Sequence, residues 1–251
     1  MRSPPTSDPL VRYSFDELRA ILRWQEETHK DDEDTPRAVL VGGWAVYAYN
    51  PYYGSYDIDL VTNNRTRRSL MHYLVTERGF EKYKSPFTGE VGVVLITPID
   101  RPVHIDFASR EGYDTFEGTG RKMSMADLVS STTVLRPGGW WVPLPSRTPL
   151  LLMKLKAAWD RQWRLDHEKS RDPDREQEKV IKDMADILAL VDATEEEPPL
   201  DVGMLGSWFE QHPELGEVLE WTAVDRRGYD FYDRDAGPVK KKVEDVLELT
   251  R

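Results

Sequence analysis

The stretch that decides the fold is Val39-Leu40-Val41-Gly42-Gly43-Trp44-Ala45-Val46, followed after a short aromatic loop by Tyr56-Asp57-Ile58-Asp59-Leu60-Val61. The first part predicts a buried strand, a turn that glycine makes easily and the start of a helix. The second part predicts a strand on which Asp57 and Asp59 share one face, because strand side chains alternate. Two adjacent carboxylates repel each other, and a bound cation relieves that repulsion. Backbone N–H groups at Gly42 and Gly43, before a helix, suit phosphate. The stretch therefore indicates a nucleotide-handling enzyme.

Composition narrows the class of protein. The 251-residue chain is 39% hydrophobic and 31% charged, which suits one large globular domain or two modest ones. It contains no cysteine, which excludes disulfides and thiolate metal sites. It has no apolar run of about 18 residues and no apolar core near the N-terminus, so we expect no membrane span, no signal peptide and a cytoplasmic location.

The charge distribution bears on possible partners. A net charge of −11 argues against a broad, non-specific nucleic-acid binder. Positive residues nevertheless gather in two places, and either group could form a local basic groove. The first group is Arg65, Arg67, Arg68, Arg78, Lys82 and Lys84. The second is Lys154, Lys156, Arg161, Arg164, Lys169 and Arg171. A solvated helix face is the alternative for each group.

Hydrophobic periodicity divides the chain into two parts. A Ser14-Phe15-Asp16-Glu17 capping box predicts a first helix from Ser14 to about His29. The strands expected up to residue 146 are 37–41, 57–62, 80–84, 91–97, 103–107, 132–135 and 140–142, with helices at 44–49 and 66–78. Turns are expected at 86–89 and 137–139. From residue 147 the pattern is helical, at 149–163, 175–191, 201–211, 213–223 and 238–248. The predicted fold is α+β, with a mixed sheet flanked by helices in residues 1–146 and a helical bundle in residues 147–251.

With these motifs placed, the chain resembles the nucleotidyltransferase superfamily. The matching blocks are Gly42-Gly43, Asp57-Ile58-Asp59 and a third carboxylate, Asp106, in Val103-His104-Ile105-Asp106-Phe107. More narrowly it resembles the AbiEii/MenT-type toxin branch, the enzymatic half of some toxin–antitoxin pairs (type IV-like). Two further blocks carry that resemblance, Lys154-x-x-Ala157-x-x-x-Arg161 and Lys182-Asp183-x-x-Asp186. One departure is Tyr53, where the branch often has arginine.

The resemblance implies a role for each matched residue. Asp57, Asp59 and Asp106 would hold Mg²⁺ or Mn²⁺, with Asp106 holding a second ion or orienting the attacking hydroxyl. Asp100 is the rival for the third position, although the following Arg101-Pro102 favours a loop there. Gly42, Gly43 and Ser55 would bind the phosphates of a nucleoside triphosphate (NTP). Lys154, with Lys156 as its competitor, and Arg161 would bind the triphosphate tail, and Asp183 and Asp186 would orient these cations. A proton relay is conceivable for His104, although a packing role is the simpler interpretation.

These roles lead to three functional hypotheses. The first is a pyrophosphate-releasing nucleotidyltransferase toxin that modifies RNA, most plausibly tRNA, and is neutralised by an antitoxin protein. The second is a small-molecule transferase of the aminoglycoside-modifying kind, since the acidic balance suits a cationic acceptor. The third is an inert binding module that retains the fold.

Overall fold

The structure is a computed structural model, and it describes residues 7–28, 36–84, 91–130, 132–135, 142–192 and 198–250. The chain forms two compact units. Unit 1 comprises residues 1–112 and 124–146, and unit 2 comprises residues 113–123 and 147–251. One boundary coincides with the predicted one at 146 and 147, whereas segment 113–123 belongs with the helical unit.

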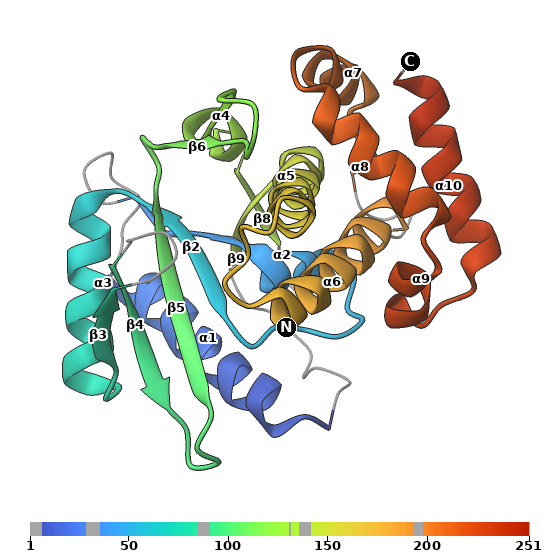
Figure 1. The fold of residues 1–251 in the computed structure, drawn as a ribbon. Helices are drawn as coiled ribbons and strands as arrows, with labels where there is room; N and C mark the ends of the chain where they lie inside the picture. Colours follow the sequence, from blue (N-terminus) through green and yellow to red (C-terminus); the bar gives the residue numbers. More distant parts are fainter. Residues whose placement is uncertain are drawn as a thin grey trace. The chain divides into compact units, whose positions relative to one another are not determined.

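Unit 1 is built around a mixed five-stranded sheet with the strand order β1-β2-β5-β4-β3 (Figure 1). Its elements are α1 (Pro9–Thr28), β1 (Val39–Val41), α2 (Gly42–Tyr49), β2 (Ile58–Thr62), α3 (Asn64–Glu77), β3 (Glu81–Lys84), β4 (Val91–Ile96), β5 (Pro102–Ser109), α4 (Met125–Val129), β8 (Thr132–Leu135) and β9 (Val142–Pro145). Strands β2 and β5 are parallel, and the other neighbours in this sheet are antiparallel. Strands β8 and β9 form a separate antiparallel hairpin.

The two faces of the sheet differ in character. Along β5, Val103, Ile105 and Phe107 are at most 1% exposed, and they alternate with half-buried His104 and Asp106. The apolar set lies on the face of the sheet that α1 and α3 cover. The half-buried set points to the opposite face, and this alternation separates the apolar core of unit 1 from its polar face.

Contacts in unit 1 link α1 to α3 and to α2. Arg78 donates two hydrogen bonds to Glu17, at 2.7 and 3.0 Å, and Trp24 stacks on Tyr73 with ring centroids 5.2 Å apart. The Trp44 indole N–H on α2 donates to the Ser14 hydroxyl of α1 over 2.9 Å, inside the core.

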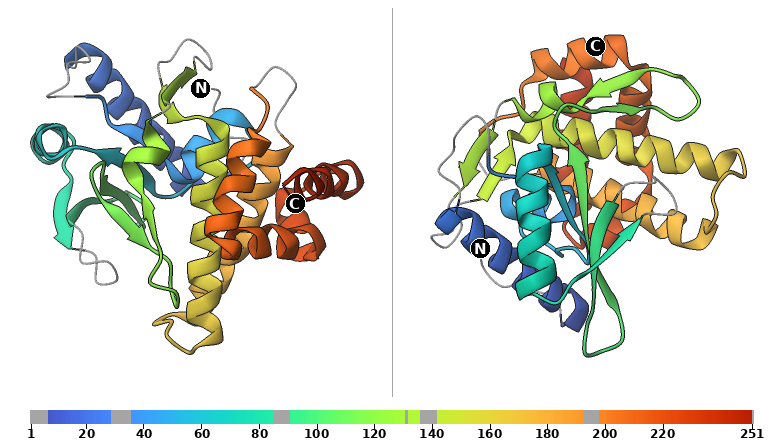
Figure 2. Two further views of the ribbon diagram at one scale, coloured as in Figure 1. Left: turned by 90° about the horizontal axis from the view of Figure 1, so that it is seen from above. Right: turned by 90° about the vertical axis from the view of Figure 1, so that its left-hand side faces the viewer.

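Unit 2 is a helical bundle with one two-stranded insertion. Its elements are β6 (Tyr113–Thr115), β7 (Lys122–Ser124), α5 (Arg147–Asp166), α6 (Pro173–Val191), α7 (Val202–Gln211), α8 (Pro213–Val224), α9 (Arg226–Tyr232) and α10 (Ala236–Leu249). The long helices α5 and α6 lie side by side (Figure 2). Within the described ranges, no helix combines the length and the apolar character that crossing a membrane requires.

The predicted start of the first helix is wrong. α1 begins at Pro9, where the Asp8 carboxylate accepts a hydrogen bond from the Leu10 N–H over 2.8 Å, so the proline takes the first helical position. Ser14 lies inside the helix and is fully buried, so it caps nothing. The predicted turns at 86–89 and 137–139 lie outside the described residues. The helices α4 and α9 and the strands β6 and β7 were not predicted.

Candidate active site

Two of the three predicted carboxylates lie opposite each other on neighbouring strands. Asp59 on β2 pairs in register with Asp106 on β5. Paired residues of parallel strands point to the same side of a sheet, so both carboxylates lie on its half-buried face. Asp57 directly precedes β2 and is also half-buried. The sheet therefore brings Asp106 beside the Asp57-x-Asp59 pair across more than forty residues of sequence.

The glycine turn lies directly against one of these carboxylates. Gly42 is the first residue of α2 and has a φ of +67°. A Cβ atom at this position would lie 2.0 Å from Asp59 Oδ2, well inside van der Waals contact. Gly42 is therefore required twice, for its backbone conformation and for the space that the Asp59 carboxylate occupies. The predicted reversal from strand to helix is confirmed, but the helix begins at Gly42 rather than at Trp44, and Gly43 lies buried in its first turn.

A residue that the sequence reasoning missed, Tyr83, completes this face. Its hydroxyl donates a short hydrogen bond to Asp106 Oδ1. Burial, this hydrogen bond and the charges of Asp106, Asp57 and Asp59 all raise the pKa of the Tyr83 phenol. The available signal was the hairpin predicted over 80–97, whose register pairs Tyr83 with Gly92 across the turn.

The chemistry of this face fits a divalent cation in part. Carboxylate oxygens are the ligands that Mg²⁺ prefers, and Asp59 and Asp106 present them from paired positions. Among the described residues, however, no three His, Asp or Glu side chains are gathered closely enough to form a ready-made metal site. The metal assignment of Asp57, Asp59 and Asp106 stays a prediction.

The loop before β2 is tied to the start of α1. The hydroxyls of Tyr53 and Tyr56 share a hydrogen bond of 2.7 Å, and Tyr56 also donates to Asp8 over 3.0 Å. Tyr53, the departure from the family pattern, thus belongs to a hydroxyl network. Ser55 is only 8% exposed in this loop. Its phosphate-binding role stays a prediction.

Unit 2 brings together the other predicted residues. Lys154 Nζ on α5 lies 3.1 Å from Asp183 and 2.6 Å from Asp186, both on α6. Arg161 makes a close ion pair with Asp183, and Lys182 contacts Asp186 at 3.0 Å. Burial alone would lower the pKa of Lys154, but the charges of Asp186 and Asp183 outweigh it and raise that pKa above its ordinary value. We call these five side chains the α5–α6 ion cluster.

Lys156, the competitor of Lys154, has a different set of partners. Its ammonium contacts Asp160 closely, Asp114 at 2.9 Å and the Thr115 carbonyl at 3.1 Å, and it lies over the Phe116 ring. It therefore fastens the 113–123 segment to α5. Lys156 thus contacts two carboxylates, whereas the α5–α6 ion cluster contains three cations and two carboxylates.

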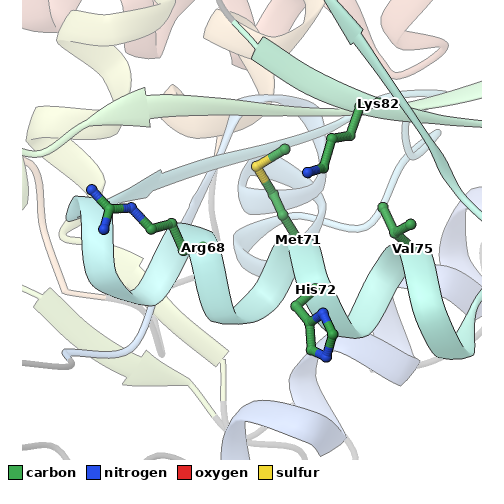
Figure 3. Close-up of a pocket in the computed structure, with 5 residues that line it drawn as sticks. All are labelled: Arg68, Met71, His72, Val75 and Lys82. Atoms are coloured by element: carbon green, nitrogen blue, oxygen red, sulfur yellow. The ribbon is translucent and has the colours of Figure 1, made fainter.

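The two predicted basic groups also differ. In the second group, Arg164 contacts Glu117 at 3.2 Å and donates to Glu176 over 3.0 Å, so it is paired like Lys154, Lys156 and Arg161. In the first group, Arg68 and Lys82 line a cavity of about 310 Å³ between α3 and β3, with Met71, His72 and Val75 (Figure 3). Lys82 alternates with Tyr83 along β3, so this cavity lies on the sheet face opposite the carboxylates.

Comparisons with known proteins give a remote likeness to a solved structure. No protein family model matches the chain, and no curated protein matches it. Among solved structures, it is similar to an antigenic nucleotidyltransferase-like protein from Paracoccidioides brasiliensis, at 19% identity and a TM-score of 0.45. That similarity covers 86% of this chain and 94% of the other. At this level of sequence and structural similarity, no residue role is transferred to this chain.

Proposed function

We propose that the protein is a phosphoryl-transfer enzyme of the nucleotidyltransferase class. The observation that carries the proposal is the in-register pair of Asp59 and Asp106, with Gly42 packed against the Asp59 carboxylate. Opposed carboxylates beside a turn of backbone N–H groups suit a reaction in which a polyphosphate must be held and its charge offset.

The residues of unit 1 would divide the work in the following way. Gly42 and Gly43 would donate backbone N–H groups to the phosphates, and Ser55 would add a hydroxyl. Asp57, Asp59 and Asp106 would hold one or two divalent cations, which when bound would offset charge on the triphosphate. Asp106 would either share in that cation binding or orient the acceptor hydroxyl. All of these roles depend on groups that are held in fixed positions, which is what nucleotidyl transfer chiefly needs.

For Lys154 and Arg161 we propose the role that the family resemblance implies, binding of the triphosphate tail. Both cations contact Asp183, so they lie close together and would bind one anionic group jointly. The contacts of Lys156 with Asp114 and Asp160 argue against the competing assignment. Asp183 and Asp186 would hold Lys154 and Arg161 in place.

Within this class, we infer an RNA-modifying enzyme, with tRNA as the favoured acceptor, that acts as the toxin of a toxin–antitoxin pair. The motif set Lys154-x-x-Ala157-x-x-x-Arg161 and Asp183-x-x-Asp186 supports this interpretation. The alternative acceptor is a small cationic molecule, which the net charge of −11 favours.

The experiment is transfer of label from each α-³²P-labelled NTP, with Mg²⁺ or Mn²⁺, to total tRNA or to an aminoglycoside. We expect label on tRNA and release of pyrophosphate. The Asp59→Asn variant should lose transfer on the order of a thousandfold, because it removes a charge from the phosphate site and keeps the side-chain shape.

Asp100→Asn is the matched control. Asp100 is exposed in the turn between β4 and β5, with a φ of +57° that asparagine also adopts readily, so its activity should be unchanged. Label on the aminoglycoside alone would select the small-molecule hypothesis. Absence of NTP and cation binding by calorimetry would select the inert module. Growth arrest that a co-expressed partner relieves would support the toxin role.

A further inference from the structure

Tyr83 reaches Asp106 across an intervening strand. Tyr83 lies on the edge strand β3 and Asp106 on β5, with β4 between them. The register places Gly92 of β4 opposite Tyr83. A Cβ atom on Gly92 would lie 2.6 Å from Tyr83 Cε1 and 2.9 Å from Asp106 Oδ1. The absence of a side chain at Gly92 therefore lets the phenol ring lie over β4 and bring its hydroxyl to the carboxylate.

A second side chain, that of His104, packs against the Tyr83 ring. The imidazole of His104 meets the Tyr83 ring edge to face, with centroids 5.0 Å apart and planes at 68°. His104 and Asp106 lie two residues apart on β5. This strand therefore supplies both the side chain that packs on the Tyr83 ring and the carboxylate that accepts its hydrogen bond. Edge-to-face packing is a favoured aromatic geometry, and it restricts the phenol to an orientation that reaches Asp106.

We propose that Tyr83 is a positioning residue that holds Asp106 by Oδ1 and thereby orients Oδ2 for the cation or the acceptor hydroxyl. The proposal rests on the proposed function, because it assumes that Asp106 serves the transfer site. A phenol hydroxyl donates one hydrogen bond, so it can engage one carboxylate oxygen and leave the other available. A neutral donor also leaves the negative charge of the carboxylate in place, which a lysine or arginine would offset.

The Tyr83→Phe variant tests this role, since it keeps the ring, the packing on Gly92 and the contact with His104. Partners that orient metal ligands typically contribute ten- to a hundredfold to affinity or rate. We expect Mn²⁺ to bind about tenfold more weakly in a titration followed by electron paramagnetic resonance. In the transfer assay, kcat should fall about tenfold while KM for the NTP changes less than about twofold.

Tyr113→Phe is the matched control, because Tyr113 lies on β6 of unit 2 and is 69% exposed. It loses the same hydroxyl and should behave as wild type. A double-mutant cycle adds a second readout. In an Asp106→Asn background, Tyr83→Phe should cause no further loss of Mn²⁺ affinity, because the phenol acts through that carboxylate.

The outcomes separate this inference from the proposed function. Wild-type Mn²⁺ affinity and kcat in Tyr83→Phe would overturn the inference and leave a contact that only braces the sheet edge. An additive loss in the double variant would overturn it too. A wild-type protein that binds Mn²⁺ but transfers nothing would overturn the transferase proposal, and the Mn²⁺ titration would still decide the role of Tyr83. A wild type that binds no Mn²⁺ would overturn both.

Discussion

The carboxylates of the two candidate sites are held in opposite ways. In unit 1 the contact that fixes Asp106 comes from a neutral phenol, and the space around Asp59 is kept by a glycine. In unit 2, Asp183 and Asp186 are 4% and 0% exposed and meet Lys154, Arg161 and Lys182. A carboxylate held by a neutral group keeps its charge for a ligand, whereas one paired with a cation contributes to the fold. The difference predicts that substitutions at the first site change activity, whereas those in the α5–α6 ion cluster, which holds the proposed triphosphate ligands, change stability as well.

The largest effect is expected at Gly42. Gly42→Ala places a methyl group 2.0 Å from the present position of Asp59 Oδ2, so the carboxylate must move. A displacement of about 1 Å in a reacting group costs about a hundredfold in rate, and we expect at least that loss of NMP transfer.

Gly79→Ala controls for backbone strain. Gly79 has a φ of +76°, but a Cβ there meets nothing within 4 Å. It should lower the free energy of unfolding by about 1 kcal/mol and leave transfer intact. Equal activity of the two variants would contradict a role for Gly42 in placing Asp59.

Lys154→Met should break the α5–α6 ion cluster. It removes the cation that Asp183 and Asp186 share and leaves each carboxylate with one partner, Arg161 or Lys182, so the free energy of unfolding should fall by less than the about 3–5 kcal/mol that follows when a buried charge loses its sole partner. The raised pKa of Lys154 gives stability that is complete below about pH 10, the ordinary lysine range, and lost as the pH rises through the folded value. Urea unfolding at neutral pH therefore measures the full effect.

Arg227→Met provides the comparison for that loss. Arg227 pairs with Asp225 at 2.6 Å, but its side chain is 51% exposed. Exposed pairs contribute at most about 1 kcal/mol, so this variant should unfold almost as wild type does. If Lys154→Met loses no more than Arg227→Met, the cluster in unit 2 is not a stabilising element.

The smallest effect is a pH dependence at Glu176. Burial raises the pKa of Glu176, but hydrogen bonds from Arg164 and Ser170 outweigh it and hold that pKa below its ordinary value. Such an acid stabilises the fold above the unfolded pKa of about 4.3, and the contribution is lost as the pH falls through the lower folded value. Glu176→Gln should therefore lose about 1 kcal/mol at pH 7 and unfold with a shallower acid dependence.

Glu178→Gln, at an exposed position of the same helix, is the control for Glu176. Its urea unfolding at neutral and acid pH should follow that of the wild type. An acid dependence that is identical in the wild type and in Glu176→Gln would assign the acid sensitivity of the protein to other groups.

Local patterns predicted much of unit 1. The alternation of apolar and acidic residues placed Asp57 and Asp59 on one face, and the strand, turn and helix at Gly42 formed as expected. The register that pairs Asp59 with Asp106 could not be predicted, because it depends on which strands become neighbours. Tyr83 was missed for the same reason, since its partner lies two strands away.

The errors also have physical causes. Ser14 matches the capping-box pattern, but it is buried in the core, where its hydroxyl accepts a hydrogen bond from the indole of Trp44, thirty residues away. Asp8 and Pro9 start the helix instead. In segment 113–123, all three residues of β6 are exposed, so no apolar alternation reveals the strand. The partner that anchors it, Lys156, lies about forty residues later.

The packing of segment 113–123 depends on residues that are made much later during synthesis. Its partners in unit 2 include Lys156, His212, which stacks on Phe116 at 4.8 Å, and Glu214, which pairs with Arg121 at 2.5 Å. During synthesis from the N-terminus, every residue of unit 1 leaves the ribosome before any of these three. The Phe116 side chain is only 1% exposed in the folded protein, and His212, which stacks on it, is made about a hundred residues later. Segment 113–123 can therefore complete its packing only after α8 has been made.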